Sequence, residues 1–235
     1  FQNMILWAGN TDVSEQKKDQ PMFMPYPSDQ TFYGYFNDFM TYTATDWTIT
    51  STDAGGDSGE VIQATSSAGG ALLITTNDAD NDSEELQLKG EAFKLSTSKK
   101  AYFSARFKLS DATESDMLLG LAITDTTAID GVSDGVFFKK DDGDTNLDFV
   151  VEKDSTETAT AAVGTVANDT FITATFFIDP DRSKVYYSIN NAAPVGVVNT
   201  NLPDDEELTV TIAVQAGAAA AKSLTVDYVS AIVER

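Results

Sequence analysis

Carboxylates are the side chains of this sequence that have the spacing of a catalytic motif. Glu152, Asp154 and Glu157 match the glycosidase pattern E-x-D-x-x-E. In a retaining glycosidase, two carboxyl groups lie about 5–5.5 Å apart across the scissile bond, one as nucleophile and the other as acid/base. The motif therefore raises the hypothesis of glycoside hydrolysis.

The residues between these carboxylates argue against catalysis. Jelly-roll glucanases carry such a motif inside a buried strand, where the intervening positions are mostly apolar. Here those positions are Lys153, Ser155 and Thr156, an apolar run over 147–151 ends just before the motif, and a second run over 158–163 follows it. We therefore expect a hairpin turn whose carboxylates point into solvent, and we predict no catalytic residues and no enzyme.

The densest acidic run could hold a cation. Asp78, Asp80 and Asp82 stand at alternate positions, as at the start of a calcium loop. An EF-hand is excluded, because its sixth position is Ser83 instead of Gly and its twelfth is Lys89 instead of a bidentate Glu. The favoured interpretation is a solvated loop between strands without metal or cofactor, and a looser calcium site near the three aspartates is the alternative.

The composition excludes several functions. The 235 residues contain no His and no Cys, which rules out a Ser-His-Asp triad, a Cys-His nucleophile and a zinc site built from Cys or His. With 15 Lys and Arg against 37 Asp and Glu, the formal net charge is −22. Such a charge repels phosphates, so we expect neither a nucleic-acid partner nor an anionic membrane partner.

A few aromatic side chains could stack on sugars. The candidates are Trp47, Tyr102, Tyr186 and Tyr187. Aromatic residues on strands more often fill the core or form cross-strand pairs, which is the interpretation we favour.

Strand patterns position all of these residues. From Trp47 onward, apolar and polar residues alternate with a period of two, most clearly over 101–109, 209–215 and 225–232. Further runs that look like strands cover 71–76, 117–124, 136–140, 147–152, 170–178, 184–189 and 194–198. Turn residues at 141–144, 179–182 and 190–191 separate them. The pattern predicts an all-β, two-sheet antiparallel sandwich.

One strand is apolar or small on both faces. Met117, Leu119 and Leu121 alternate with Leu118, Gly120, Ala122 and Thr124. This pattern favours a central strand. Its minor face offers almost no hydrogen bonds to sugar hydroxyls, so we expect the second sheet or the chain's own loops to cover it.

Residues 1–40 differ in composition from the sandwich domain predicted over 41–235. They are dense in aromatic residues, and three prolines within residues 21–27 prevent a helix. We interpret them as an extended arm that packs on a partner; the alternative is a disordered tail, although such tails are poor in aromatics. The predicted partner contacts are Phe1, Met4, Ile5, Leu6, Trp7, Met22, Phe23, Met24 and Tyr26.

An ordered series of motifs resembles one family. The series comprises FNDF at 36–39, DWTIT at 46–50, EAFKL at 91–95, GLAITD at 120–125, KDDGDTNLDFVVEK at 140–153, LPDDEEL at 202–208 and LTVDY at 224–228. It is similar to tailed-bacteriophage virion structural proteins with a concanavalin A-like jelly roll, over about 200 residues.

The resemblance implies a structural role. We expect a capsid decoration or cement protein on the outer surface of the virion, bound through its arm to the major capsid protein or to neighbouring copies in the shell. The alternative is a carbohydrate-binding module on the virion that adheres to host or environmental glycans. A glycosidase is the third hypothesis.

Overall fold

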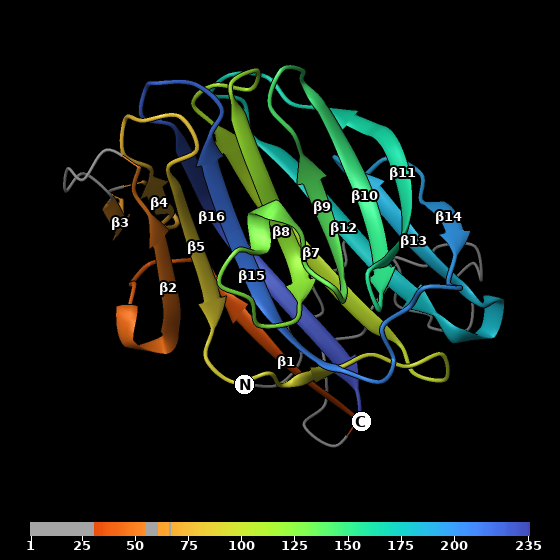
Figure 1. The fold of residues 1–235 in the computed structure, drawn as a ribbon. Helices are drawn as coiled ribbons and strands as arrows, with labels where there is room; N and C mark the ends of the chain where they lie inside the picture. The colour runs from red at the N-terminus through yellow and green to blue at the C-terminus, as the bar shows by residue number, and fades with distance from the viewer. Residues whose placement is uncertain (1–30, 55–60, 66) are drawn as a thin grey trace.

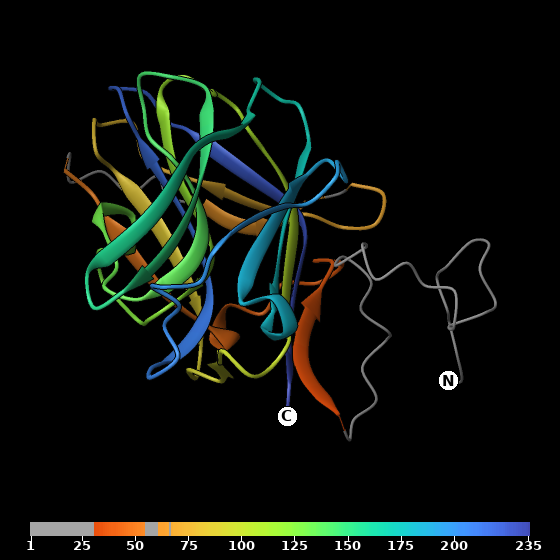
Figure 2. The same ribbon diagram turned by 90° about the vertical axis from the view of Figure 1, so that its right-hand side faces the viewer.

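The chain forms a sandwich of two antiparallel sheets, with eight strands assigned to each. This computed structural model describes residues 31–54, 61–65 and 67–235. Figure 1 views the sandwich from the side of one sheet, which we call the front sheet, and Figure 2 shows the two layers from the side. The all-β jelly-roll prediction is confirmed.

The back sheet contains the last strand of the chain near its middle. Its order is β14 (Val195–Val198), β13 (Lys184–Ile189), β12 (Ile172–Asp179), β7 (Ala101–Leu109), β16 (Ser223–Glu234), β4 (Leu72–Thr75) and β3 (Val61–Ala64). Strand β1 (Phe32–Asn37) also pairs with β16, beyond the end of β4.

The front sheet has the predicted central strand at its middle. Its order is β11 (Thr156–Thr165), β10 (Asn146–Lys153), β9 (Gly135–Lys140), β8 (Ser115–Ala122), β15 (Glu207–Ala216), β5 (Ser83–Leu88) and β2 (Trp47–Thr52), and β6 (Phe93–Lys94) pairs with β15. Three short 3-10 helices complete the described elements: η2 (Ala44–Asp46), η3 (Ala128–Asp130) and η4 (Pro180–Arg182). No helix in the described part of the chain is long and apolar enough to span a membrane.

The alternating residues of the strands build one core between the sheets. On β7, Phe103 and Phe107 point inward, and Phe103 stacks on Phe176 of β12 with ring centroids 5.1 Å apart. From the front sheet, Phe138 and Phe149 complete this aromatic centre at 5.0 Å from each other. Burial of such side chains contributes roughly 1.5–3 kcal/mol each, so the period-two pattern directly specifies the sandwich.

The sandwich begins earlier than the sequence predicted. Residues 32–40 were assigned to the arm, but β1 pairs along its length with β16, and Phe39 is fully buried beside Trp47. Phe39 has a positive φ of 51°, and its backbone N–H donates to Asn37 Oδ1. The predicted boundary is too late, because the prolines at 21–27 do not characterise the whole segment up to residue 40. Strand β1 itself contains no proline, and its more buried and more exposed side chains alternate as in other strands.

Gly70 gives a test of how tightly this first segment is packed. A Cβ on Gly70 would lie 2.5 Å from the Met40 nitrogen and from the Phe39 carbonyl carbon, whereas a Cβ on Gly90 would meet nothing within 4 Å. Both glycines have positive φ, 85° and 89°, so both substitutions carry the same left-handed strain of about 1–2 kcal/mol.

We therefore expect Gly70→Ala to destabilise the fold by about 1–3 kcal/mol more than Gly90→Ala, since only Gly70 is overpacked. Urea unfolding of the full chain measures the difference. Equal losses for the two variants would mean that residues 38–40 are not held against Gly70.

Candidate functional site

The outward side of the front sheet, which we call the front face, is the surface where a jelly roll could present a site. Register places Leu118, Gly120 and Ala122 of β8 on it, beside Phe137 of β9 and Ala213 of β15. A Cβ on Gly120 would collide with the Phe137 backbone, so this glycine is needed for the close approach of β9. The floor of the face is therefore apolar along these residues, and Thr209 and Thr211 of β15 lie beside them as buried polar neighbours.

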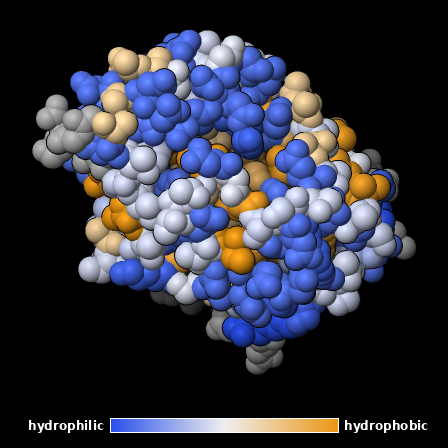
Figure 3. Space-filling model, viewed as in Figure 1, coloured by the Kyte–Doolittle hydropathy of each residue, from blue (hydrophilic) through white to orange (hydrophobic). Residues whose placement is uncertain are grey.

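A loop of the chain covers this floor. Residues 123–134, which we call the covering loop, carry η3 across the middle of the front face (Figure 1). Its buried side chains join the floor in a second hydrophobic cluster, separate from the main core: Leu118, Ala122, Ala128, Ile129, Val132, Phe137, Val150 and Ala213. Seen from this side, the surface is mostly polar, with small apolar groups in the middle (Figure 3). The expectation that the chain's own loops cover this face is confirmed.

Two side chains of β5 fasten the covering loop. The Glu85 carboxylate accepts hydrogen bonds from the backbone N–H groups of Ala128 at 2.8 Å and Ile129 at 3.3 Å. Gln87 donates to the Ile123 carbonyl at 3.0 Å and accepts from the Asp125 N–H at 2.9 Å. Burial raises the pKa of Glu85 despite the two backbone donors. Both oxygens of the Glu85 carboxylate are therefore bound to the backbone of the covering loop.

The acidic run expected to be a solvated loop ends sooner than the sequence predicted, because Ser83, Glu84 and Glu85 are buried in β5. The alternation of Leu86 and Leu88 with Glu85 and Gln87 is the sequence signal for this strand. No local pattern indicates that Glu85 binds the covering loop.

The glycosidase-like motif lies on the predicted hairpin. Asp154 and Ser155 form the turn between β10 and β11, both with positive φ, and Glu152 pairs directly with Glu157. The two glutamates are therefore cross-strand neighbours on the front face instead of pointing separately into solvent. Burial raises the pKa of Glu152, and repulsion from Glu157 and Asp134 adds to the effect.

This pair of glutamates stands beside a structural carboxylate. Asp134 is buried and accepts a hydrogen bond from the Asp154 backbone N–H at 3.0 Å, which supports the hairpin turn. Glu157 itself is exposed. The arrangement provides two adjacent acids, while the covering loop occupies the neighbouring part of the face.

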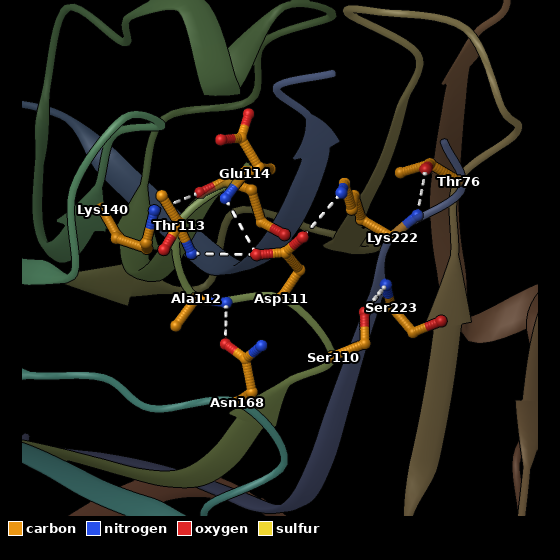
Figure 4. Close-up of polar contacts among 11 residues, drawn as sticks. Thr76, Ser110, Asp111, Ala112, Thr113, Glu114, Lys140, Asn168, Lys222 and Ser223 are labelled. Atoms are coloured by element: carbon orange, nitrogen blue, oxygen red, sulfur yellow. Dashed lines mark hydrogen bonds and ion pairs between the residues drawn. The ribbon is translucent and has the colours of Figure 1, made fainter. Parts of the chain in front are cut away.

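A second polar group ties together the loops at one end of the sandwich. Asp111 accepts hydrogen bonds from the backbone of Thr113 and Glu114, both at 3.1 Å, and from Lys222 Nζ at 2.8 Å (Figure 4). The Lys222 backbone N–H donates to Thr76 Oγ1 at 3.0 Å. The hydrogen bond from Lys222 lowers the pKa of Asp111. These contacts join three loops that are far apart in sequence.

Lys140 is buried in the same end of the molecule. Its Nζ donates to the Ser115 carbonyl at 2.6 Å and to the Asp141 carbonyl at 2.8 Å. Burial lowers the pKa of Lys140, although Asp116 and other nearby carboxylates oppose this effect, and burial raises the pKa of Asp116. An amine held by two carbonyls is a cross-link within the fold and is not available as a nucleophile.

The three candidate calcium ligands have different surroundings. Asp82 is buried, and its carboxylate accepts from the backbone N–H groups of Ala54 at 2.6 Å and Ala79 at 2.8 Å. Asp78 and Asp80 are exposed. Over the described residues, no group of three or more His, Cys, Asp or Glu side chains has a geometry suited to a metal ion. A calcium ion near these aspartates therefore stays the alternative to a loop without metal.

The structure divides the four candidate aromatics into two groups. Trp47 and Tyr187 belong to the core, and Tyr187 packs on Phe149 with centroids 5.3 Å apart. Tyr102 and Tyr186 lie on the outward side of the back sheet, next to Phe177. All nine predicted partner contacts, from Phe1 to Tyr26, lie outside the described residues.

Comparison with known proteins supports the fold and does not extend to a family. No protein-family model matches the sequence, and no curated protein matches it. Among solved structures, a Shewanella oneidensis MR-1 protein of unknown function, SO2946, is similar with a TM-score of 0.60, at 16% identity over 96% of this chain and 95% of that one.

A glucanase and a lectin share the same architecture. The endo-1,3-beta-glucanase from Streptomyces sioyaensis has a TM-score of 0.58 at 16% identity, over 90% of this chain and 99% of the enzyme. Peanut lectin has a TM-score of 0.58 at 11% identity, over 86% of this chain and 97% of the lectin. At these identities the likeness is one of fold, and the fold is the lectin-like jelly roll.

Proposed function

We propose that this chain is a non-catalytic structural protein of a bacteriophage virion, a capsid decoration or cement protein attached through its N-terminal arm. The observation that carries this proposal is the closure of the front face. The covering loop packs on the apolar floor and is held there by Glu85 and Gln87. The chain itself therefore fills the middle of the front face, where a ligand would otherwise bind. A face that is filled by the chain itself suits a structural protein that stabilises a capsid by binding to it.

Charge and sequence support the same role. The net charge of −22 suits an outer surface, because the packaged genome inside a capsid is itself negative. The ordered motifs that resemble tailed-phage virion proteins run from Phe36 to Tyr228, across both sheets. The apolar side chains that precede the sandwich would then bury their surface only in the assembly.

A carbohydrate-binding module is the second candidate. It is favoured by the fold shared with peanut lectin and by Tyr102 and Tyr186, which lie outside the core on the back sheet. Aromatic rings on such a surface can stack on sugars when polar groups fix the orientation.

The first prediction tests the attachment. In the full chain, replacing Met4, Ile5, Leu6 and Trp7 together by Ser should abolish co-sedimentation with capsids of the phage that carries this protein. The matched control replaces the exposed Phe36 and Met40, 65% and 69% exposed, by Ser and should leave binding intact. Wild type should bind in a fixed ratio to the major capsid protein. If the quadruple variant still binds capsids in the same ratio as wild type, these four residues are not needed for attachment.

The second prediction tests catalysis. Wild type and the double variant Glu152→Gln, Glu157→Gln should both leave β-glucans intact, because the two acids lie beside a face closed by the covering loop. Release of reducing sugar is the measurement. Hydrolysis by wild type that the double variant lacks would make this chain an enzyme.

The third prediction concerns pH and stability. Because burial and repulsion raise the pKa of Glu152 in the fold, the charged form opposes folding, and this loss develops as the pH rises through the folded pKa. Glu152→Gln should therefore raise Tm by about 1–3 °C at pH 7, since relieving a like-charged cross-strand pair is worth about 0.2–1 kcal/mol.

The gain should vanish near pH 3, which is more than one unit below the unfolded glutamate pKa of about 4.3, so that Glu152 is protonated in both states. Glu206→Gln is the matched control, because Glu206 is exposed, and it should change Tm little at either pH. A gain that is the same at both pH values would show that it does not come from the charge.

The fourth prediction separates the two candidate functions. Wild type should bind no glycan on a broad array under conditions in which it binds capsids. A reproducible hit that Tyr186→Ala abolishes, and that Tyr228→Ala preserves, would favour the carbohydrate-binding function instead.

A further inference from the structure

Strand β14 ends the back sheet and leaves one of its edges open. Within the described residues it pairs only with β13, and Figure 1 shows it at the right-hand end of the sheet. Val195 and Val198 are 49% and 53% exposed. Register places Val195 beside Tyr187 on the inner side of the sheet and Val198 beside Lys184 on its outer side. The open edge therefore carries an exposed apolar side chain on each of its two sides.

The other strands that end the two sheets have features that hinder pairing with another chain. On β11, Ala162 has a positive φ of 55° where the register shifts, and its N–H donates to Asp148 Oδ1 within the same sheet. Strand β2 lies between Asp46 and Asp53, and Glu60 precedes β3. Bulges and charges of this kind protect an edge from adding a strand. Strand β14 has no charged residue and pairs with β13 without a register shift.

The distribution of charge favours contact between two copies at this edge. With a net charge of −22, two copies repel each other over most of their surfaces. Residues 182–203, which include β14, are the longest run of the sequence without Asp or Glu. Two carboxylates close to the ends of this run are paired with cations: Asp179 with Arg182 at 2.7 Å, and Asp204 with Lys153 at 2.7 Å. Two copies can therefore approach each other at β14 with little repulsion.

We propose that β14 pairs antiparallel with β14 of a second copy, so that the back sheet continues from one molecule into the next. A two-fold axis presents the same strand on both sides of the contact. Because side chains alternate along a strand, the inner sides of the two sheets lie together only when one residue pairs with itself. An axis at Gly196 places Val195 against Val197 of the second copy and Val198 against its Pro194. Both exposed valines then have apolar neighbours.

The small size of this contact determines its strength. Strand β14 has four residues, so the pair buries less surface than the roughly 1,200–2,000 Å² of a stable complex. We therefore expect a weak dimer, which forms at about 1 mM protein and dissociates at about 1 µM. Backbone hydrogen bonds and apolar side chains hold the pair, whereas the force that opposes it is electrostatic. Salt should therefore strengthen the dimer, because the Debye length falls from about 10 Å at 0.1 M to about 3 Å at 1 M.

This inference goes beyond the proposed function and does not depend on a capsid. It assigns a second surface of the chain to contact between copies, apart from the arm. Copies that are held close together on a particle have a high effective concentration, at which a weak contact forms. A chain that does not pair through β14 could still attach through its arm, so the two proposals fail separately.

Sedimentation velocity and NMR on the full chain test the proposal. Between about 1 µM and about 1 mM protein, the sedimentation coefficient should rise from that of a monomer to that of a dimer. The rise should begin at a lower protein concentration in about 1 M NaCl than in about 0.1 M NaCl. In ¹⁵N spectra, dilution should shift the amide signals of residues 195–198 and leave those of residues 158–161 on β11 in place.

Val198→Glu should weaken the dimer about tenfold or more, because the two-fold axis brings two like charges into one small contact. Val198→Thr keeps the β-branched shape without a charge and should preserve the dimer. Ala159→Glu is the matched control, because it adds the same charge at an exposed position of the end strand β11, and it should weaken the dimer little. A chain that stays monomeric at about 1 mM in about 1 M NaCl, or a dimer that Val198→Glu leaves unchanged, would overturn the proposal.

Discussion

The antiparallel pairing of the last strand is the constraint on which the rest of this structure depends. Strand β16 pairs with β7 along one edge and with β4 and then β1 along the other. Its inward residues, among them Val226, Val229 and Ala231, lie in the main core. The back sheet therefore closes only when residues 229–234 meet residues 32–37 and residues 223–226 meet residues 72–75. The front sheet packs on the core that this sheet provides.

The buried charged side chains of this acidic protein hold loops in place, both on the front face and at the end of the sandwich where Asp111 and Lys222 meet. Glu85 is buried because it satisfies backbone donors of the covering loop, and Asp111 and Lys222 are held together where loops meet. Lys140 binds carbonyls among carboxylates. Glu85, Lys140 and Lys222 each have a partner on a segment distant in sequence, so each holds one loop in place. The many exposed carboxylates are left to set surface charge and solubility.

The sequence was sufficient for the architecture and insufficient for the roles of individual polar residues. Alternation over 101–109 correctly predicted a strand, and the two-sided apolar pattern of 117–122 correctly predicted a central strand, because period and burial are local signals. The contact between Glu85 and Ala128 joins residues 43 apart, and no local pattern encodes it. Strand β1 was missed for a related reason: its partner is β16, about two hundred residues away.

The pairing of β1 with β16 also has a mechanical consequence. Any load that a partner applies through the arm enters the sandwich at residue 31, next to Arg235. Inter-strand hydrogen bonds lie perpendicular to the strands. A pull along β1 therefore loads all of its bonds together in shear, whereas a pull away from the sheet breaks them one after another like a zipper. The direction of a pull at residue 31 thus decides how much force the pairing of β1 with β16 withstands.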